Sequence, residues 1–351
     1  MTAMFPGAVE CAGKPTRDFT YIPSRRRRLS EYEAVTCCAQ PDVDGFDQQG
    51  WLLRDVNGRT PWIRESTALV HPNWFLFRDP ASHWQRTYVR MQAEQERAIA
   101  RSAEDAAANG VFNEFDPVWT REILGRHYRA WAYAEYGLFR AFAVAQREAL
   151  SDTLGNVFCF EAFDRMRHAQ DIVLHLLELE DHVDGFADDG AKAVWLEDQR
   201  YQPTRRLVEE LLAGNDWAEL AVVTNLVFDP ILTELAVSQL VRRFGPFHGD
   251  PVTPHLVGTT DRDRRRNLAW TQEFVRMVTD PTVPECQKNA ATMSAWLDSW
   301  TPKVLEAAKA MADVYDVPPL QVARFDEVFA VARQNQEELV AGLDLKVGTA
   351  A

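Results

Sequence analysis

Cysteine is scarce in this sequence, with five residues among 351, and no two of them form a Cys-x-x-Cys pair. This pattern argues against a disulfide framework and, with no signal-peptide pattern, predicts a cytoplasmic protein. No stretch approaches the ~20 consecutive apolar residues of a membrane-spanning helix, so a membrane is not expected as a partner. There is no glycine-rich phosphate loop and no Gly-x-Ser-x-Gly elbow, which leaves hydride transfer and serine hydrolysis without support.

Positive charge is also in short supply. The sequence has 38 basic and 52 acidic residues and a formal net charge of −14, and such a surface repels phosphate backbones. Nucleic acid is therefore not expected as a partner. A run of four arginines would either pair with acidic groups of a partner subunit or lie in a solvated segment. The run consists of Arg25, Arg26, Arg27 and Arg28.

Apolar residues make up 46% of the chain, which is enough for a large core. Residues 1–80 are rich in proline and aromatic residues and show no sustained helical period, so we expect an extended irregular N-terminal arm there. The aromatic residues of the arm need an apolar surface, either on the chain's own bundle or, as the composition favours, on a partner subunit. Besides the arginine run, the candidate interface residues are Tyr32, Trp51 and Trp74.

Residues 81–345 have the pattern of long helices, and strand signals are almost absent, so the expected fold class is mostly α. Helices of about 30 residues without a heptad seam are typical of a large bundle in which helices are buried on several sides. Glycine and proline mark the expected breaks. After a first helix that ends at Asn109 and Gly110, the expected spans are 115–151, 154–183, 190–198, 203–213, 215–244, 251–279, 287–314 and 317–342.

One helical segment, Phe160–Asp171 with the sequence FEAFDRMRHAQD, has the spacing of a metal site. Carboxylate-bridged diiron bundles take a Glu-x-x-His from each of two helices, because side chains at i and i+3 share a helix face. Asp164, Arg167 and His168 match the Asp-Glu-x-Arg-His motif of soluble diiron monooxygenase hydroxylases. Arg165 stands where the metal-binding glutamate belongs. The segment thus resembles the motif of that family with one ligand replaced.

Other segments resemble further iron-binding positions of the same family. Glu135 lies in a segment similar to the one that carries the first iron-binding glutamate. A fainter second motif has Arg264 in the glutamate position and Asn267 in the histidine position if Asp263 is the motif aspartate, a register that the sequence leaves open by two residues. Asn225 begins a segment similar to the family's Glu-Ala-Cys-Phe-x-x-Pro, in which no glutamate occupies the ligand position.

The likeness extends to β subunits of these hydroxylases, through segments such as Asp18–Arg28 and Trp84–Val89, and covers about residues 17–280. It implies a ferritin-like (ribonucleotide-reductase-like) helical bundle that lacks iron and scaffolds a catalytic α subunit. The diiron centre of that α subunit would insert one oxygen atom of O2 into a small hydrocarbon, with short alkenes or alkanes favoured. The family also implies a small coupling protein and a separate reductase that takes electrons from NADH through FAD and a 2Fe-2S cluster.

The replaced ligand decides what the site is expected to do. A guanidinium remains protonated, and its charge at ~4 Å from a dication would cost on the order of 8 kcal/mol at an effective dielectric constant of ~20. We therefore expect neither metal nor cofactor in this chain and predict that Glu135 and Arg165 form a buried ion pair. His168 would then be oriented by Asp164 or a neighbour. The alternative is that Glu135 and Arg165 are ordinary surface charges.

Two further hypotheses stay open. His168, His175 and His182 recur every seven residues, about 10 Å apart along a helix, which is too far for two of them to share one ion unaided. His175 has Asp171 four residues before it, and His182 has a glutamate at the same spacing, so each pair could form half a metal site. The chain would then be a metal-binding ferritin-like oxidase in its own right. The other alternative is a stand-alone regulatory or binding protein.

Overall fold

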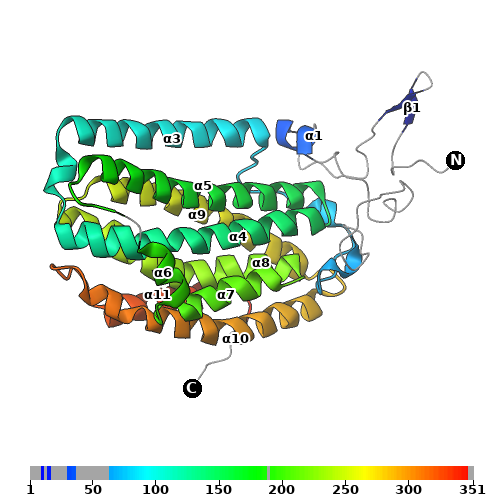
Figure 1. The fold of residues 1–351 in the computed structure, drawn as a ribbon. Coiled ribbons are helices and arrows are strands. Elements are labelled where there is room, and N and C mark those ends of the chain that lie inside the picture. Colours follow the sequence, from blue (N-terminus) through cyan, green and yellow to red (C-terminus); the bar gives the residue numbers. More distant parts are fainter. Residues whose placement is uncertain (1–8, 12–13, 17–29, 37–62, 188–189, 347–351) are drawn as a thin grey trace.

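A computed structural model describes residues 9–11, 14–16, 30–36, 63–187 and 190–346 of the chain. These residues form a bundle of long helices, and a small antiparallel hairpin of β1 (Val9–Cys11) and β2 (Lys14–Thr16) precedes it (Figure 1). The mostly α fold class expected from the sequence is confirmed. The long α-helices are α3 (Gln85–Ala108), α4 (Arg129–Glu148), α5 (Asp152–His182), α9 (Val252–Thr279), α10 (Cys286–Ala310) and α11 (Phe325–Ala341).

Shorter elements connect and extend these helices. The short α-helices are α1 (Glu31–Thr36), α6 (Ala191–Glu197), α7 (Gln202–Ala213) and α8 (Trp217–Val223). The 3-10 turns are η2 (Arg64–Ser66), η3 (Trp74–Leu76), η4 (Val111–Glu114), η7 (Gly245–His248) and η8 (Ala312–Asp316). The wider π-helical turns are η5 (Trp119–Tyr128) and η6 (Thr224–Arg242).

Helix boundaries follow local capping chemistry. The hydroxyl of Ser151 accepts a hydrogen bond from the N–H of Leu154 at the start of α5, and Asp216 caps α8 in the same way. The expected helices at 115–151 and 215–244 both contain π-helical segments that sequence reasoning missed. In η6, Pro230 has no N–H to donate, which breaks the α-helical hydrogen-bond pattern. The last expected helix, 317–342, was placed too early. The helix begins at Phe325, after Pro318 and its neighbours.

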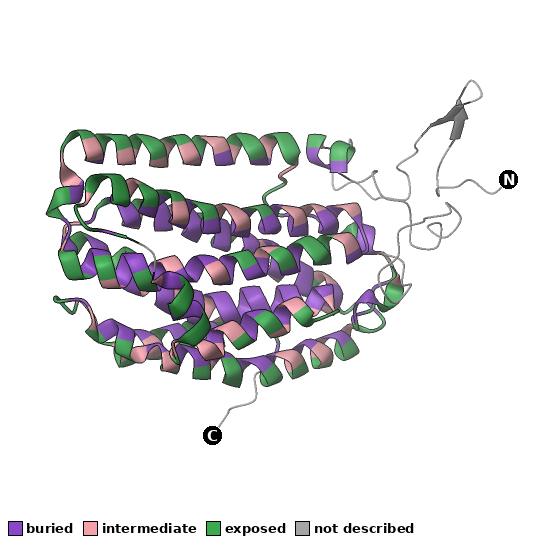
Figure 2. Ribbon diagram, viewed as in Figure 1, coloured by how far each residue is buried: buried purple, intermediate pink, exposed green. Residues whose placement is uncertain are grey.

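The core lies around η6, which packs against α8, α9, α10 and α11, while α4 and α5 run side by side along most of their length (Figure 1). The continuous helix Trp217–His248 is long and apolar enough to cross a membrane, but 89% of its most apolar window is buried inside the bundle. It is therefore the core helix. Figure 2 shows the opposite character in α3, which is largely exposed and covers α5 and α9 from outside.

Close helix packing depends on a glycine in α4. A Cβ atom added to Gly137 would lie 2.2 Å from Cγ1 of Val208 on α7, well inside van der Waals contact. The absence of a side chain therefore lets α4 and α7 approach each other. This contact fixes the position of the helix that carries Glu135.

Within the N-terminal segment, residues 30–36 and 63–80 contain side chains that are buried against the chain's own bundle. The Trp74 ring lies 5.5 Å from that of Trp217 and 6.4 Å from that of Phe274. The buried hydroxyl of Tyr32 accepts a hydrogen bond of 3.0 Å from the N–H of Asp79. The prediction that Tyr32 and Trp74 face a partner subunit was therefore wrong, because both side chains belong to the chain's own core. The other candidate interface residues, Trp51 and the arginines at 25–28, lie outside the described residues.

Candidate functional site

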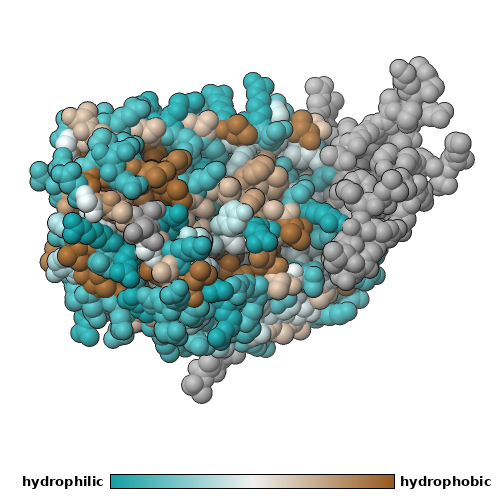
Figure 3. Space-filling model, in the orientation of Figure 1, coloured by the Kyte–Doolittle hydropathy of each residue, from teal (hydrophilic) through white to brown (hydrophobic). Residues whose placement is uncertain are grey.

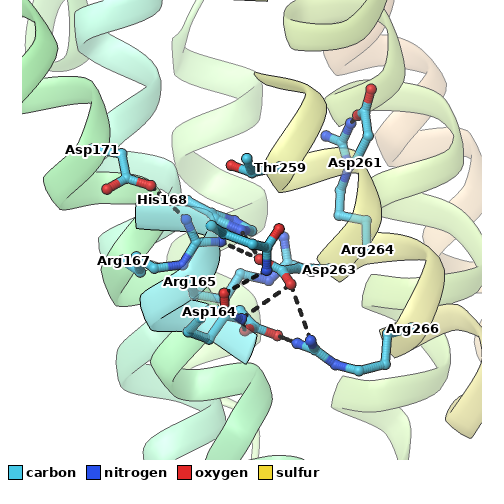
Figure 4. Close-up of polar contacts among 12 residues, drawn as sticks. Asp164, Arg165, Arg167, His168, Asp171, Thr259, Asp261, Asp263, Arg264 and Arg266 are labelled. Atoms are coloured by element: carbon cyan, nitrogen blue, oxygen red, sulfur yellow. Dashed lines mark hydrogen bonds and ion pairs between the residues drawn. The ribbon is translucent and has the colours of Figure 1, made fainter. Parts of the chain in front are cut away.

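Arg165 lies at the centre of the bundle with a fully buried side chain (Figure 4). Its Nη1 lies 3.4 Å from Oε2 of Glu135 on α4, and its Nη2 lies 3.1 Å from Oε1 of Glu161, one turn earlier on α5. Asp229 of η6 accepts two hydrogen bonds from the same guanidinium, of 3.0 and 2.5 Å. The predicted buried ion pair between Glu135 and Arg165 is confirmed. Glu161 and Asp229 were not predicted, since neither occupies a motif position.

The carboxylates around Arg165 differ in how readily they ionise. Burial alone would raise the pKa of Glu135, but the charge of Arg165 and a contact with His168 lower this pKa to about 2. At Glu161 burial prevails over the attraction of Arg165 and raises the pKa to about 7. One carboxyl of the cluster is thus close to half protonated at neutral pH, which reduces the excess of negative charge around a single guanidinium.

His168 faces two acidic residues. Its Nε2 lies 3.2 Å from Oδ2 of Asp263 on α9, and its Nδ1 lies 3.6 Å from Oε2 of Glu135. Burial would lower the pKa of His168, but these two carboxylates outweigh it and raise the pKa. Its ring is therefore held through Nε2 by the neighbour Asp263, while Nδ1 lies near Glu135 without a hydrogen bond.

Two aspartates connect α5 and α9 in a reciprocal pattern (Figure 4). Asp263 of α9 pairs with Arg167 of α5, and Asp164 of α5 pairs with Arg266 of α9. Asn267 Nδ2 also donates to Asp164 at 3.1 Å, as His168 contacts Asp263. Each aspartate thus contacts the residues three and four positions after its counterpart on the other helix. This reciprocity is what the register with Asp263 as the second motif aspartate requires.

Helix α3 covers the two aspartates with polar side chains that the sequence did not single out. The hydroxyl of Tyr88 donates to Asp164 at 2.8 Å, and its ring stacks on Phe160 at 4.2 Å. The Nε2 of Gln92 donates to both Asp164 and Asp263, at 2.9 and 3.1 Å. Tyr88 and Gln92 lie four residues apart and therefore share one face of α3. This i, i+4 spacing is the sequence signal that could have indicated a polar contact between α3 and the bundle.

At Arg264 the second motif departs from the first. Arg264 turns away from Asp263 and pairs with Asp261, while its Nη2 donates to the hydroxyl of Ser238 at 2.6 Å (Figure 4). Asn225 lies in the core and donates through Nδ2 to Glu161 at 3.0 Å. The similarity in sequence between Arg165 and Arg264 therefore does not extend to their contacts.

The histidine stripe of α5 is divided among separate contacts. His175 Nε2 lies 2.7 Å from the hydroxyl of Thr253, while Asp171 pairs with Arg167 at 2.6 Å, so the His175–Asp171 pair of the alternative hypothesis does not form. His182 contacts Glu178 at 3.1 Å, as its spacing suggested. Within the described part of the chain, no group of three or more histidine, cysteine or acidic side chains is arranged to hold a metal ion.

The residues around Arg165 do not fit an iron pair. A ferrous pair needs carboxylates that are free to bridge it and neutralise its charge. Here Glu135, Glu161 and Asp229 all point at the N–H groups of a guanidinium, which brings a positive charge to the centre of the cluster. The arrangement can hold charge and connect helices, and it provides no open coordination position.

Comparisons with known proteins agree with this fold. A structure of phenol hydroxylase from Pseudomonas sp. OX1 superimposes with a TM-score of 0.77 over 92% of each chain, at 20% sequence identity. A propane 2-monooxygenase hydroxylase component small subunit from Mycolicibacterium goodii is 32% identical over 97% of this chain and 92% of its own length. A methane monooxygenase component A beta chain from Methylosinus trichosporium is 34% identical over 67% of this chain and 61% of its own length.

The fold is therefore the helical-bundle fold of that phenol hydroxylase chain. A model of the methane/phenol/alkene hydroxylases matches residues 51–281, and the chain belongs to this family. It is a β-type subunit of a hydroxylase component and thus part of an oxidoreductase. The family carries its diiron centre in the catalytic subunit, which makes an α subunit the partner of this chain.

Proposed function

We propose that the chain is a non-catalytic scaffold that holds the diiron α subunit of a hydrocarbon monooxygenase. The observation that carries the proposal is the fully buried Arg165, which is bound by three carboxylates at a position where the family motif has an iron ligand. A cluster of this kind joins α4, α5 and η6 through charge-assisted hydrogen bonds and leaves the chemistry to the partner.

On this proposal the motif positions are remnants of a diiron site that now serve a structural role. Five of them connect helices α5 and α9: Asp164 contacts Arg266 and Asn267 of α9, and Asp263 contacts Arg167 and His168 of α5. The remnant positions are Glu135, Asp164, Arg165, Arg167, His168, Asn225, Asp263, Arg264 and Asn267.

An exposed apolar groove between α4 and α5 offers a surface on which another subunit could dock. The groove has a volume of about 360 Å³, and its lining includes Tyr136 and Leu174, whose exposed fractions are 46% and 62%. Figure 3 shows apolar side chains gathered over α5 on this face. Exposed apolar patches of this kind mark protein interfaces. We assign this groove to contact with the α subunit. The role of residues 1–80 as an arm that contacts other subunits stays a prediction.

The names of the relatives support a proposal for the reaction of the complex. Curated relatives act in propane and methane monooxygenase systems. We therefore propose a short alkane or alkene as the substrate of the complex, with NADH-derived electrons delivered by a separate FAD and 2Fe-2S reductase and a small coupling protein. The assembly would work in the cytoplasm.

Co-purification tests the proposal. A tagged copy of the full chain, expressed with the genes beside its own, is expected to retain a larger subunit with two intact Glu-x-x-His motifs. Turnover of propane or propene should require both subunits. Leu174→Glu should weaken the retention, while Val331→Glu, a matched change at an exposed valine of α11, should not. Iron in stoichiometric amount and oxygenase turnover in the lone chain would instead favour the independent oxidase, and a stable lone chain with no partner would favour the stand-alone binding protein.

A further inference from the structure

A row of arginine side chains, here called the arginine face, runs along the outward side of α3. Arg86, Arg90, Arg97 and Arg101 are exposed, and at about 3.6 residues per turn they lie within about 60° of one another around the helix. Arg90 contacts Glu94 at 3.3 Å, while the other three form no ion pair with any residue that the structure describes. The arginine face is therefore a basic surface on a chain whose net charge is −14.

The charges of α3 run against its helix dipole. Acidic side chains stabilise the first turn of a helix, and basic side chains stabilise the last turn. The first turn of α3 contains Arg86 and no acidic residue, and its last turn contains Asp105 and no basic residue. The arginines therefore do not serve the stability of α3 itself. Their position is better explained by a contact outside the chain.

A hollow of about 410 Å³ lies among the arginine side chains. Its apolar lining includes Ala93 and Val89, of which Val89 is 54% exposed. Guanidinium groups bind carboxylates through paired hydrogen bonds, while an exposed apolar hollow takes an apolar side chain. The arginine face therefore fits a protein segment in which an apolar residue has acidic residues on either side. The arginines that line the hollow are Arg86, Arg90 and Arg97.

Phe163 of α5 connects the arginine face to the groove between α4 and α5. It is 52% exposed, and its ring lies 6.3 Å from that of Tyr88, the residue before Val89 on α3. Met166, three residues further along the same face of α5, lines the groove. Protein interfaces have an apolar centre and a polar rim. The arginine face thus lies where the rim of an interface centred on the groove would run.

We propose that the arginine face binds an acidic segment of the α subunit, whose carboxylates pair with Arg86, Arg97 and Arg101 around an apolar side chain in the hollow. The proposal rests on the assignment of the groove to that subunit. A nucleic acid or an anionic membrane fits less well, because a chain of net charge −14 repels an extended polyanion. Charge pairs at a rim mainly speed assembly and make it depend on ionic strength.

Chemical cross-linking of the co-expressed hydroxylase tests the contact. Arg97→Lys keeps the positive charge and supplies an amine that a carbodiimide joins to a carboxylate in direct contact. We expect mass spectrometry of the digested complex to show residue 97 joined to an acidic peptide of the α subunit. Arg333→Lys, a matched change at an exposed arginine of α11, should give no such product. A product that joins residue 97 only to Glu94 of the same helix would overturn the proposal.

Charge reversal measures how much the arginine face contributes to assembly. Arg97→Glu should weaken the association of the two subunits by about tenfold at about 0.1 M NaCl, and the deficit should shrink at about 0.5 M because salt screens exposed charges. Arg333→Glu makes the same change in charge on α11 and should associate as the unmodified chain does.

The outcomes separate this inference from the scaffold role. If the α subunit is retained and both Arg97 variants behave as their Arg333 controls, the inference fails and the scaffold role stands. If the unmodified chain retains no α subunit, both fail. Binding of single-stranded DNA or of phosphatidylglycerol vesicles that Arg97→Glu abolishes would also overturn the inference and assign the arginine face to a polyanion.

Discussion

Arg165 of α5 and Asp229 of η6 meet through two hydrogen bonds, 3.0 Å from Nη1 to Oδ1 and 2.5 Å from Nη2 to Oδ2. This forked contact fixes the plane of the guanidinium, and the same two terminal nitrogens also meet Glu135 and Glu161, at 3.4 Å from Nη1 and 3.1 Å from Nη2. The cluster joins helices that are distant in sequence. It is therefore expected to stabilise the bundle as one unit.

Removing the guanidinium should be costly. Arg165→Met is expected to lower the free energy of unfolding by about 3 to 5 kcal/mol, because it leaves buried carboxylates without their counter-charge. Urea unfolding followed by circular dichroism measures the change. Arg333→Met removes an exposed ion pair with Glu337 and serves as the control, with an expected loss below about 1 kcal/mol. Equal losses in the two variants would show that the Arg165 cluster contributes no more than a surface pair.

The raised pKa of Glu161, about 7, predicts a pH dependence of stability. The unfolded chain releases this proton near the ordinary value of 4.5, so between about pH 4.5 and 7 the folded state binds more protons. The contribution of Glu161 to the free energy of unfolding therefore falls as pH rises through this window. Glu161→Gln should remove the fall, so that the variant gains on the order of 3 kcal/mol relative to the unmodified chain between pH 4.5 and 8.

Chemical unfolding at a series of pH values tests the role of Glu161. The pKa of Glu135 is lowered to about 2, so the contribution of Glu135 to stability is lost only as pH falls below this window. It therefore does not mask the effect of Glu161 on the free energy of unfolding. Stability curves that run parallel for the unmodified chain and Glu161→Gln would contradict the raised pKa.

The two members of each reciprocal ion pair between α5 and α9 should be energetically coupled. A double-mutant cycle between Arg167→Gln and Asp263→Asn is expected to give a coupling energy of about 1 to 3 kcal/mol, and the cycle between Arg266→Gln and Asp164→Asn should match it. The control is the exposed pair of Arg333 and Glu337, for which coupling below about 0.5 kcal/mol is expected. Coupling at control level in both buried cycles would refute the cross-linking role.

Helix packing at Gly137 gives a prediction independent of charge. Gly137→Ala should lower the free energy of unfolding by about 1 to 3 kcal/mol, because its Cβ would overlap Cγ1 of Val208. Val208→Ala in the same chain should restore part of the loss by making room. Gly258→Ala, on α9 with no atom near the added Cβ, is expected to stabilise by about 0.5 to 1 kcal/mol. A stabilising Gly137→Ala would show that the close approach of α4 and α7 is not required.

Sequence reasoning found the parts of the site that follow helix periodicity. The i, i+3 spacing of Arg165 and His168 placed both on the buried face of α5, and the interval to Glu135 indicated the facing helix. It missed Asp229, because η6 is π-helical and Pro230 changes which residues of that segment face α5. A spacing rule for an α-helix does not hold in a π-helical segment.

Tertiary packing decided the remaining differences. Arg264 occupies the same motif position as Arg165, yet Asp261 lies one turn before it and offers a nearer partner, so it turns toward its own helix. The sequence around Trp74 does not indicate whether its ring packs on a partner subunit or in the chain's own core. In the structure the ring packs against Trp217 and Phe274 of the same chain. The position of Trp74 thus depends on residues more than a hundred positions away, which a local sequence pattern does not reveal.

The central claim is that this chain carries no iron and that Arg165 occupies the place of a metal ligand. The most direct test is an anomalous difference map of the assembled hydroxylase, measured from crystals at the iron absorption edge. The account predicts iron peaks in the α subunit and no peak among Glu135, Glu161 and Asp229, where density for the Arg165 guanidinium should lie instead. An iron peak at that position in this chain would contradict the account.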